Sequence, residues 1–456
     1  MSDWHDAERR IEKAQELFAQ QRWQEALDEL RAAIAINPYN GAWHFNLGLT
    51  LDELERFDEA INAYRRSLEI DPDDVEALYR VGMDLLRLSQ FESAIASFAR
   101  IQEVDPTFEP SYCGRIIAYT ELGDHDQAEE MFYLARHFKD ECPHCYANIA
   151  RSLFQRHLYD KAIYCWQRTL DLDESHPEVH QCIAQAFRAK GELEKARQHY
   201  LQELRINPGD MHTLLDLGDL LLEMGRIDDA GEKLRRAIEL APQHPAAHLH
   251  YARWLRSCDR LAAARNALNK ALELDPHYPG IHICLAQICI QERDLPHALR
   301  HLRAELRLQP EDPDLLMELA NLFMDCSQGR PAAACLQRLV AFQPHDLHAW
   351  QNLAVAYFMA RHYAEGIAAC QEALKLDPSQ TMTLYNLALA YHHQGDYITA
   401  LAWLHHATQL DPHDPSLQRL ELRIRLLMAW NWLKRFLHPF FFFWHRPPRL
   451  PLEPKS

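Results

Sequence analysis

Two cysteines separated by two residues, Cys142 and Cys145, form the most reactive pairing in the sequence, and they enclose Pro143 and His144. This spacing is used by dithiol oxidoreductases and by proteins that bind zinc. The motif stands where we expect a helix to begin, and a thiol at a helix N-terminus has a lowered pKa. The residues therefore suggest either thiol redox chemistry or a metal site.

Two histidines further along the chain, His176 and His180, extend the zinc interpretation because imidazole is a common zinc ligand. Against it, eleven cysteines in 456 residues produce roughly 0.3 such pairs by chance. An odd number of cysteines without a framework is typical of reduced thiols. We therefore expect no catalytic residue and no metal here, and we keep a zinc-binding or thiol-redox protein acting through Cys142 and Cys145 as the alternative.

The elements that position this motif follow a period of 34 residues. Prolines mark the period at Pro38, Pro72, Pro106, Pro208, Pro242, Pro276, Pro310, Pro344, Pro378 and Pro412. Asp140 and Glu174 stand at the two in-phase places without proline, and alanine stands twelve residues before each place, with Gly366 as the one substitute. A small residue at a fixed place lets two helices cross closely. Pro143 belongs to this pattern, because proline suits the first turn of a helix.

Apolar residues between the marks have helical spacing. Trp350, Leu353, Ala354 and Tyr357 stand at i, i+3, i+4 and i+7, as on one face of an amphipathic helix. A second such stripe follows in each unit, after a short turn that often contains glycine. The unit "TLYNLALAYHHQGDYITALAWLHHATQLDP" (383–412) resembles the tetratricopeptide repeat family, and the resemblance covers about twelve units.

The resemblance implies an all-α fold, a right-handed α-solenoid (superhelix) of helix-turn-helix units. Residues 1–412 would form the solenoid, residues 413–438 a C-terminal capping helix, and residues 439–456 an aromatic, proline-rich and basic tail. In this family the first helix of each unit lines a long concave groove. Because each unit contacts only its neighbours, no compact pocket is expected.

The positions that face the groove in this family provide candidate partner-binding residues. They are Phe45, Tyr79, Met83, Arg151, Arg188, Arg253, Arg256, Met317, Phe358 and Tyr385. Apolar side chains dominate the early and late units, and arginine dominates the middle. Methionine adapts to irregular apolar surfaces, and arginine holds carboxylates bidentately. We expect a protein or peptide partner with apolar ends and an acidic middle, unless the apolar residues only pack between adjacent helices.

Charge and composition exclude several function classes. The net charge of −18 argues against nucleic acid as a partner, because phosphate binding needs a basic surface. No glycine-rich phosphate loop, nucleophile elbow or pair of carboxylates stands out from the periodic pattern, so we expect neither an enzyme nor a cofactor. Acidic residues of the helices are expected on exposed faces. The charged start, MSDWHDAERRIEK, lacks the apolar segment of a secretory signal, which predicts a cytoplasmic protein.

The end of the chain has a different composition. From Ser416 onward the sequence contains eight lysines and arginines but only two glutamates. Aromatic residues gather there as Trp430, Trp432, Phe440, Phe441, Phe442, Phe443 and Trp444. Asn431, Lys434 and Pro439 interrupt any apolar run long enough to cross a bilayer. Aromatic and cationic groups together favour the membrane–water interface, so we keep three interpretations: a peripheral anchor at the inner face of a membrane, a docking segment, and disorder.

These patterns together predict a non-enzymatic scaffold that binds peptides or proteins in its concave groove. They also leave room for a tail that holds the scaffold at a membrane surface. The process that such a scaffold serves does not follow from the repeats, because solenoids support many functions.

Overall fold

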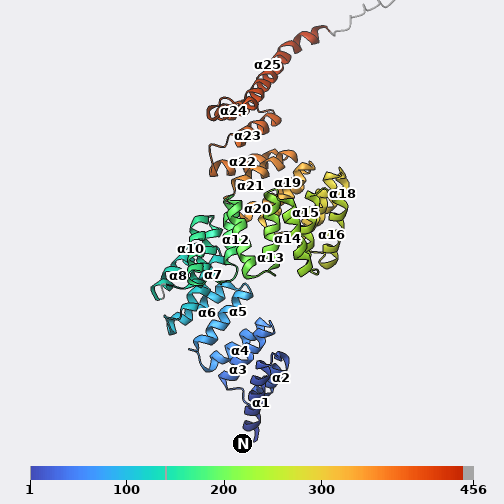
Figure 1. Cartoon of the computed structure of the whole chain (residues 1–456). Helices are drawn as coiled ribbons and strands as arrows, with labels where there is room; N and C mark the ends of the chain where they lie inside the picture. Colours follow the sequence, from blue (N-terminus) through green and yellow to red (C-terminus); the bar gives the residue numbers. More distant parts are fainter. Residues whose placement is uncertain (1, 139–140, 445–456) are drawn as a thin grey trace, which may run out of the picture. The chain divides into compact units, whose positions relative to one another are not determined.

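Helices joined by short turns make up the computed structural model of the chain (Figure 1). The structure describes residues 2–138 and 141–444, and it describes side chains for residues 4–138 and 141–433. Within these residues there are twenty-five α-helices and no strand, which confirms the all-α prediction. The chain divides into two units, Met1–Leu240 and Ala241–Ser456.

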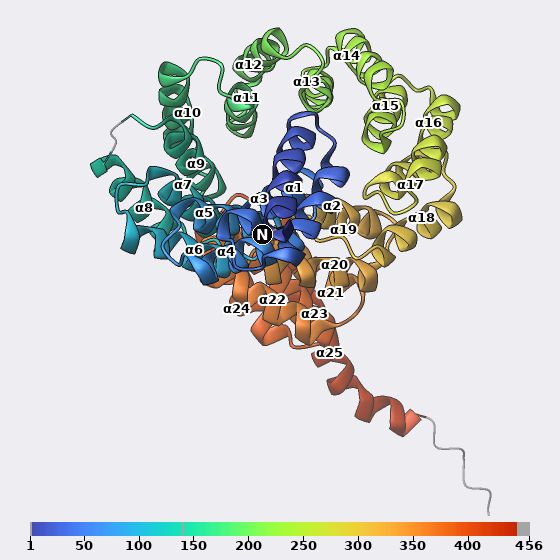
Figure 2. The same ribbon diagram turned by 90° about the horizontal axis from the view of Figure 1, so that it is seen from below.

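The first unit is a stack of seven hairpins, each made of an odd-numbered helix and the even-numbered helix that follows it. Its helices are α1 (Ser2–Ala19), α2 (Trp23–Ile36), α3 (Gly41–Glu53), α4 (Phe57–Ile70), α5 (Val75–Arg87), α6 (Phe91–Val104), α7 (Glu109–Glu121), α8 (His125–Phe138), α9 (Pro143–Gln155), α10 (Tyr159–Leu172), α11 (Val179–Ala189), α12 (Leu193–Ile206), α13 (Met211–Glu223) and α14 (Ile227–Leu240). Figure 2 shows α9, α11 and α13 on the inner side of this stack and α10, α12 and α14 on its outer side.

The second unit contains five further hairpins and a terminal helix. Its helices are α15 (Pro245–Ser257), α16 (Leu261–Leu274), α17 (Ile281–Gln291), α18 (Leu295–Arg307), α19 (Pro313–Asp325), α20 (Gly329–Phe342), α21 (Leu347–Met359), α22 (Tyr363–Leu376), α23 (Thr381–Gln394), α24 (Tyr397–Leu410) and α25 (Pro415–Trp444). The hairpins of both units follow the 34-residue period, so the predicted succession of helix pairs is confirmed.

Local signals start the helices and turn the hairpins. Gly123 and Gly395 have φ of +74° and +83°, a conformation that glycine adopts without a Cβ clash, and each ends the first helix of its hairpin. The Asp74 side chain accepts a hydrogen bond from the backbone N–H of Ala77 at 3.1 Å and so caps α5. Short-range chemistry of this kind sets the ends of these helices.

Small residues allow the helices of a hairpin to approach. The repeated alanines are fully buried at Ala26, Ala60, Ala94, Ala128, Ala162, Ala196, Ala230, Ala264, Ala298, Ala332 and Ala400. Glycine is required at some crossings, since a Cβ added to Gly82 would stand 2.5 Å from the ring of Phe98. The sequence-based expectation of close helix crossings is therefore met by side-chain volume.

The C-terminal helix closes the core of the second unit. Leu417, Leu420 and Ile424 of α25 are buried in one cluster with Leu384 of α23 and Leu404 of α24. This is the arrangement expected of a capping helix, because the last hairpin of a repeat stack would otherwise expose its apolar face.

The same helix continues past residue 438 to Trp444. Its backbone thus includes Phe440, Phe441, Phe442, Phe443 and Trp444, whose side chains lie outside the described residues. Residues 445–456, the rest of the predicted tail, also lie outside them. No helix in the described part of the chain is long and apolar enough to cross a membrane.

Candidate functional site

The predicted apolar start of the groove lies on α3 and α5 as a row of half-buried side chains. Phe45 of α3 packs against Tyr64, with ring centroids 5.5 Å apart, and Tyr79 of α5 packs against Phe98 at 6.0 Å. Met83, one turn after Tyr79, packs against the same buried cluster. These side chains pack between adjacent helices and also keep part of their surface exposed.

The basic middle of the predicted groove is paired in part with the next repeat. Arg151 of α9 has an exposed side chain. Arg188 of α11 forms an ion pair with Glu223 of α13, with its Nε 3.1 Å from each carboxylate oxygen. The side-chain amide of Gln181 donates to Asp216 of α13 at 2.9 Å. Polar side chains therefore join α11 to α13 across two repeats.

The second unit repeats this arrangement on its own first helices. Gln287 of α17 donates to Glu318 of α19 at 2.5 Å. Asn352 of α21 donates to the sulfur of Met317 in α19 at 3.3 Å. The predicted groove face therefore carries contacts that hold consecutive repeats together.

The remaining predicted groove residues of the second unit are half-buried. Arg253 and Arg256 lie on α15, and Phe358 and Tyr385 pack at the edge of buried clusters of α21 and α23. The ring of Phe358 occupies the space beside Gly366, where a Cβ would contact it. This explains why glycine replaces alanine in that repeat.

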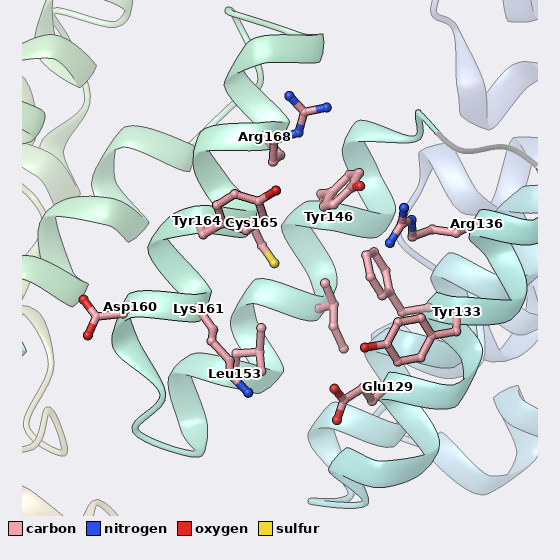
Figure 3. A pocket seen from close by; sticks show the side chains of 12 residues that line it. Glu129, Tyr133, Arg136, Tyr146, Leu153, Asp160, Lys161, Tyr164, Cys165 and Arg168 are labelled. Atoms are coloured by element: carbon pink, nitrogen blue, oxygen red, sulfur yellow. The ribbon is translucent and has the colours of Figure 1, made fainter.

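A pocket of about 560 Å³ lies between α8, α9 and α10, and its walls contain none of the predicted groove residues. Tyr133 and Arg136 come from α8, Tyr146 from α9, and Tyr164 and Arg168 from α10 (Figure 3). The side chains of Tyr133 and Tyr164 are 59% and 61% exposed. Tyrosine rings beside guanidinium groups can hold a flat or acidic side chain of a partner. The sequence had no signal for this pocket, because its residues are scattered over three helices.

Cys142 and Cys145 lie together with two residues of α7, Glu109 and Cys113, which the spacing of the motif does not predict as metal ligands. We call this set the thiol cluster. Its three Sγ atoms and one carboxylate oxygen all lie within 4.8 Å of one another. The Sγ of Cys113 is 3.8 Å from that of Cys142 and 2.7 Å from that of Cys145. A carboxylate oxygen of Glu109 lies 3.5 Å from Cys113 Sγ and 3.7 Å from Cys145 Sγ, and it accepts a hydrogen bond from Cys142.

The thiol cluster is buried and lies at the start of two helices. Cys142 is the N-cap of α9, and its Sγ accepts a hydrogen bond from the backbone N–H of Cys145 at 3.2 Å. Cys113, Cys142 and Cys145 are 9%, 3% and 1% exposed. Hydrogen bonds with Cys113 and then Cys145 lower the pKa of Cys142. Hydrogen bonds with Cys142 and Cys145, together with burial, raise the pKa of Cys113.

The two histidines considered as further zinc ligands lie elsewhere. His176 Nε2 is 3.1 Å from Nδ1 of His144, and His180 Nδ1 is 3.1 Å from Nδ1 of His199. Each of these two histidines thus lies beside another histidine. The residues that lie around Cys142 and Cys145 instead are Glu109 and Cys113.

The period of 34 residues contained a signal for these two missed residues. Glu109 precedes Pro143 by one period, so the first turns of α7 and α9 occupy equivalent places in consecutive repeats. Cys113 follows Glu109 by four residues, one helical turn later, and both therefore lie on one face of α7.

The stacked hairpins define an all-α repeat protein, and comparison with protein families assigns it. Models described as tetratricopeptide repeat match residues 11–75, 148–210, 187–253, 221–288, 348–380 and 369–402. Together these matches cover more than half of the chain. The chain belongs to the tetratricopeptide repeat family, and its repeats mark it as a protein-interaction scaffold.

Solved structures of the same architecture resemble it at low sequence identity. A chain of the APC/C hetero-tetramer Cut9-Hcn1 is 17% identical, with 90% of this chain and 95% of that chain covered and a TM-score of 0.39. Yeast Tom70 is 14% identical, with 96% and 99% covered and a TM-score of 0.40. YrrB, a repeat protein with an unusual peptide-binding site, is 22% identical, with 41% and 97% covered and a TM-score of 0.36. A comparison with curated proteins found no match.

Proposed function

We propose that the chain is a non-enzymatic scaffold that binds peptides along the first helices of its repeats. The observation that carries this proposal is the half-buried apolar row of α3 and α5, where Phe45, Leu49, Tyr79 and Met83 keep part of their surface exposed. Rings and a thioether already held by packing lose little side-chain entropy on binding, and methionine adapts to different partners. The apolar end of a partner would lie there.

An acidic segment of the partner would then lie beside the arginines of the first unit. Arg151 is exposed, and Arg188 is held in place by Glu223. A carboxylate of the partner would reach the open edge of the guanidinium group of Arg151 and would compete with Glu223 for that of Arg188. Charge-assisted hydrogen bonds of this kind give orientation as well as affinity.

A site-specific comparison tests the apolar row. The Met83→Glu variant places a charge in the row, and we expect at least tenfold weaker binding of peptides selected against the full chain. Ile70→Glu is the matched control, because Ile70 lies on the second helix α4 and is 44% exposed. Peptide affinity is measured by isothermal titration, and thermal melting checks that both variants fold. Equal affinity of the Met83→Glu and Ile70→Glu variants for every selected peptide would contradict the proposed row.

We further propose that α25 attaches this cytoplasmic scaffold to the inner surface of a membrane. Leu422, Leu426, Trp430 and Leu433 are 60%, 62%, 54% and 38% exposed and recur at three- and four-residue intervals. They form a stripe opposite Leu417, Leu420 and Ile424, which pack into the second unit. A helix with an exposed apolar stripe and flanking arginines can lie in the interface of an anionic bilayer.

Vesicle sedimentation tests this attachment. The full chain should sediment with vesicles of phosphatidylserine and phosphatidylcholine, and the Leu426→Glu/Trp430→Glu variant should stay in the supernatant. Leu410→Glu serves as the control, since Leu410 is 44% exposed on α24 outside the stripe. A full chain that stays in the supernatant at all phosphatidylserine contents would exclude the membrane and leave a docking segment.

A further inference from the structure

We propose that Glu109, Cys113, Cys142 and Cys145 bind one structural Zn²⁺ that clamps α7 to α9. This inference does not depend on the proposed peptide binding, because the thiol cluster contains none of the candidate partner-binding residues named for the groove. It gives the Cys-Pro-His-Cys motif a ligand set different from the one that the sequence suggested.

The donor set has the composition of a closed zinc site. Three thiolates and one carboxylate supply four protein ligands, which is the number that structural zinc sites use. Soft sulfur ligands select zinc over magnesium or calcium, which prefer oxygen. Because the four protein atoms would fill a tetrahedral shell, no position remains for a substrate. The site is therefore structural rather than catalytic.

Five donor-to-donor separations can be compared with those of a tetrahedral zinc site, and three of them already fit. With Zn–S of about 2.3 Å and Zn–O of about 2.1 Å, the edges of the tetrahedron are about 3.8 Å for two sulfurs and about 3.6 Å for sulfur and oxygen. The Cys113–Cys142 separation is 3.8 Å, and Glu109 lies 3.5 Å and 3.7 Å from the sulfurs of Cys113 and Cys145. Cys113 and Cys145, at 2.7 Å, must move apart by about 1 Å to receive the ion. The Cys142–Glu109 pair must open as well.

The surroundings favour the ionised ligands that zinc requires. Glu109 is the first residue of α7, and Cys142 is the N-cap of α9, so the positive ends of two helices face the cluster. The backbone N–H of Cys145 already donates to Cys142 Sγ, which orients that ligand as an outer partner does in metal sites. Glu109 is the more exposed member and provides the path by which the ion enters.

Burial argues against thiol exchange as the use of this motif. The three cysteines are at most 9% exposed, so the disulfide of a protein substrate could not reach their sulfurs. The geometry therefore supports a metal clamp rather than an oxidoreductase.

The location gives the clamp a structural purpose. The cluster joins the first helices of the fourth and fifth repeats, which are separated by α8. At this boundary the sequence has Asp140 at the place where most repeats carry the closing proline. Zinc bonds between α7 and α9 would fix the stacking of two repeats at that boundary.

Metal analysis of the full chain is the direct test. Protein purified with a reductant and a low concentration of zinc should contain about one zinc per chain, as measured by inductively coupled plasma mass spectrometry. Substitution by Co²⁺ should give sulfur-to-cobalt charge-transfer bands and intense visible bands, which report a tetrahedral sulfur-rich site. Folded wild-type protein that holds neither zinc nor cobalt, or that contains a Cys113–Cys145 disulfide under these conditions, would overturn the proposal.

Variants locate the metal within the chain. Cys113→Ser and Cys145→Ser should each weaken Co²⁺ binding at least a hundredfold, and Glu109→Gln should weaken it about tenfold while leaving the sulfur bands. Cys165→Ser is the matched control, because Cys165 is 8% exposed and lies outside the cluster. Circular dichroism checks folding of each variant. Unchanged cobalt bands in the Cys113→Ser/Cys142→Ser/Cys145→Ser variant would place the metal elsewhere and contradict the proposal.

Discussion

Arg188 and Glu223 form an ion pair between the first helices of two consecutive repeats, with Nε of Arg188 3.1 Å from both carboxylate oxygens. Both side chains are partly exposed, Arg188 by 31% and Glu223 by 44%. The pair therefore stabilises the stack modestly, and its main effect is to hold a guanidinium group in position on the predicted groove face.

Arg188→Ala should lower the free energy of unfolding by less than about 1 kcal/mol, because partly exposed ion pairs contribute little. Binding of acidic peptides should fall more clearly, since the variant loses a positioned cation. A double-mutant cycle with Glu223→Ala in urea denaturation measures the pair, and peptide titration measures binding. Arg236→Ala is the control, because Arg236 pairs with Glu239 on the second helix α14. If the Arg188 and Arg236 variants bind peptide equally well, Arg188 is not a contact.

Gly82→Ala should destabilise the first unit by about 1–3 kcal/mol, because the added Cβ would stand 2.5 Å from the Phe98 ring in a packed layer. Gly209→Ala provides the matched control: its Cβ would meet only Asn207, at 3.9 Å. Denaturation followed by circular dichroism compares the two variants. Equal stability of both would mean that the hairpin relaxes without cost at Gly82.

Ile424→Ala should loosen the end of the second unit, because the fully buried Ile424 closes the core over α23 and α24. Truncation of a large buried aliphatic side chain costs about 2–5 kcal/mol. Each repeat contacts only its neighbours, so amide hydrogen exchange should rise first in α23 and α24. Leu422→Ala, at a site 60% exposed, should leave exchange unchanged. Uniform exchange throughout the second unit in the Ile424 variant would argue against a local cap.

The free energy of unfolding should fall as the pH drops from about 6.5 to about 4, because the folded state favours the neutral forms of His199 and His301 and the unfolded chain takes up the protons. Burial, with repulsion from His180 and His282 respectively, lowers the pKa of each to about 4 from an ordinary value near 6.5. In this window the unfolded chain binds more protons than the folded chain. The stabilisation of the folded state by the two neutral imidazoles is therefore fully present above pH 6.5, and it is lost as the pH falls from there through the folded pKa.

Urea denaturation at pH 7 and at pH 4.5 measures this dependence. His199→Gln/His301→Gln should lose less stability than the wild type between the two pH values. Carboxylates titrate in both proteins, so only the difference between the proteins reports the histidines. His345→Gln, at an exposed site, should behave as the wild type does. An equal loss in the double variant and the wild type would show that these imidazoles do not set the acid response.

The helical hairpins could be predicted in detail because their signals are local. Apolar side chains at three- and four-residue spacing, such as Trp350 and Leu353, specify one buried face of a helix. Left-handed glycines such as Gly123 turn the hairpin without help from distant residues. The terminal cap was likewise predictable, because Leu417, Leu420 and Ile424 recur at helical intervals.

Acidic residues show where local rules end. Helix periodicity predicts that they lie on exposed faces, yet Glu305 is fully buried. It accepts hydrogen bonds from the backbone N–H groups of Gly280 at 2.7 Å and His282 at 3.2 Å, at the start of α17. Helix periodicity cannot reveal such a carboxylate, because its partners stand 25 and 23 residues away.

The sequence by itself determined the family, the number of repeats and the order of helices, since each depends on contacts within a single 34-residue period. Only the tertiary structure decided that Cys142 and Cys145 meet Cys113 and Glu109 rather than His176 and His180. The physical reason is that stacking brings equivalent turns of consecutive first helices together. Which side chains face one another there depends on the rotation between repeats, which no single repeat encodes.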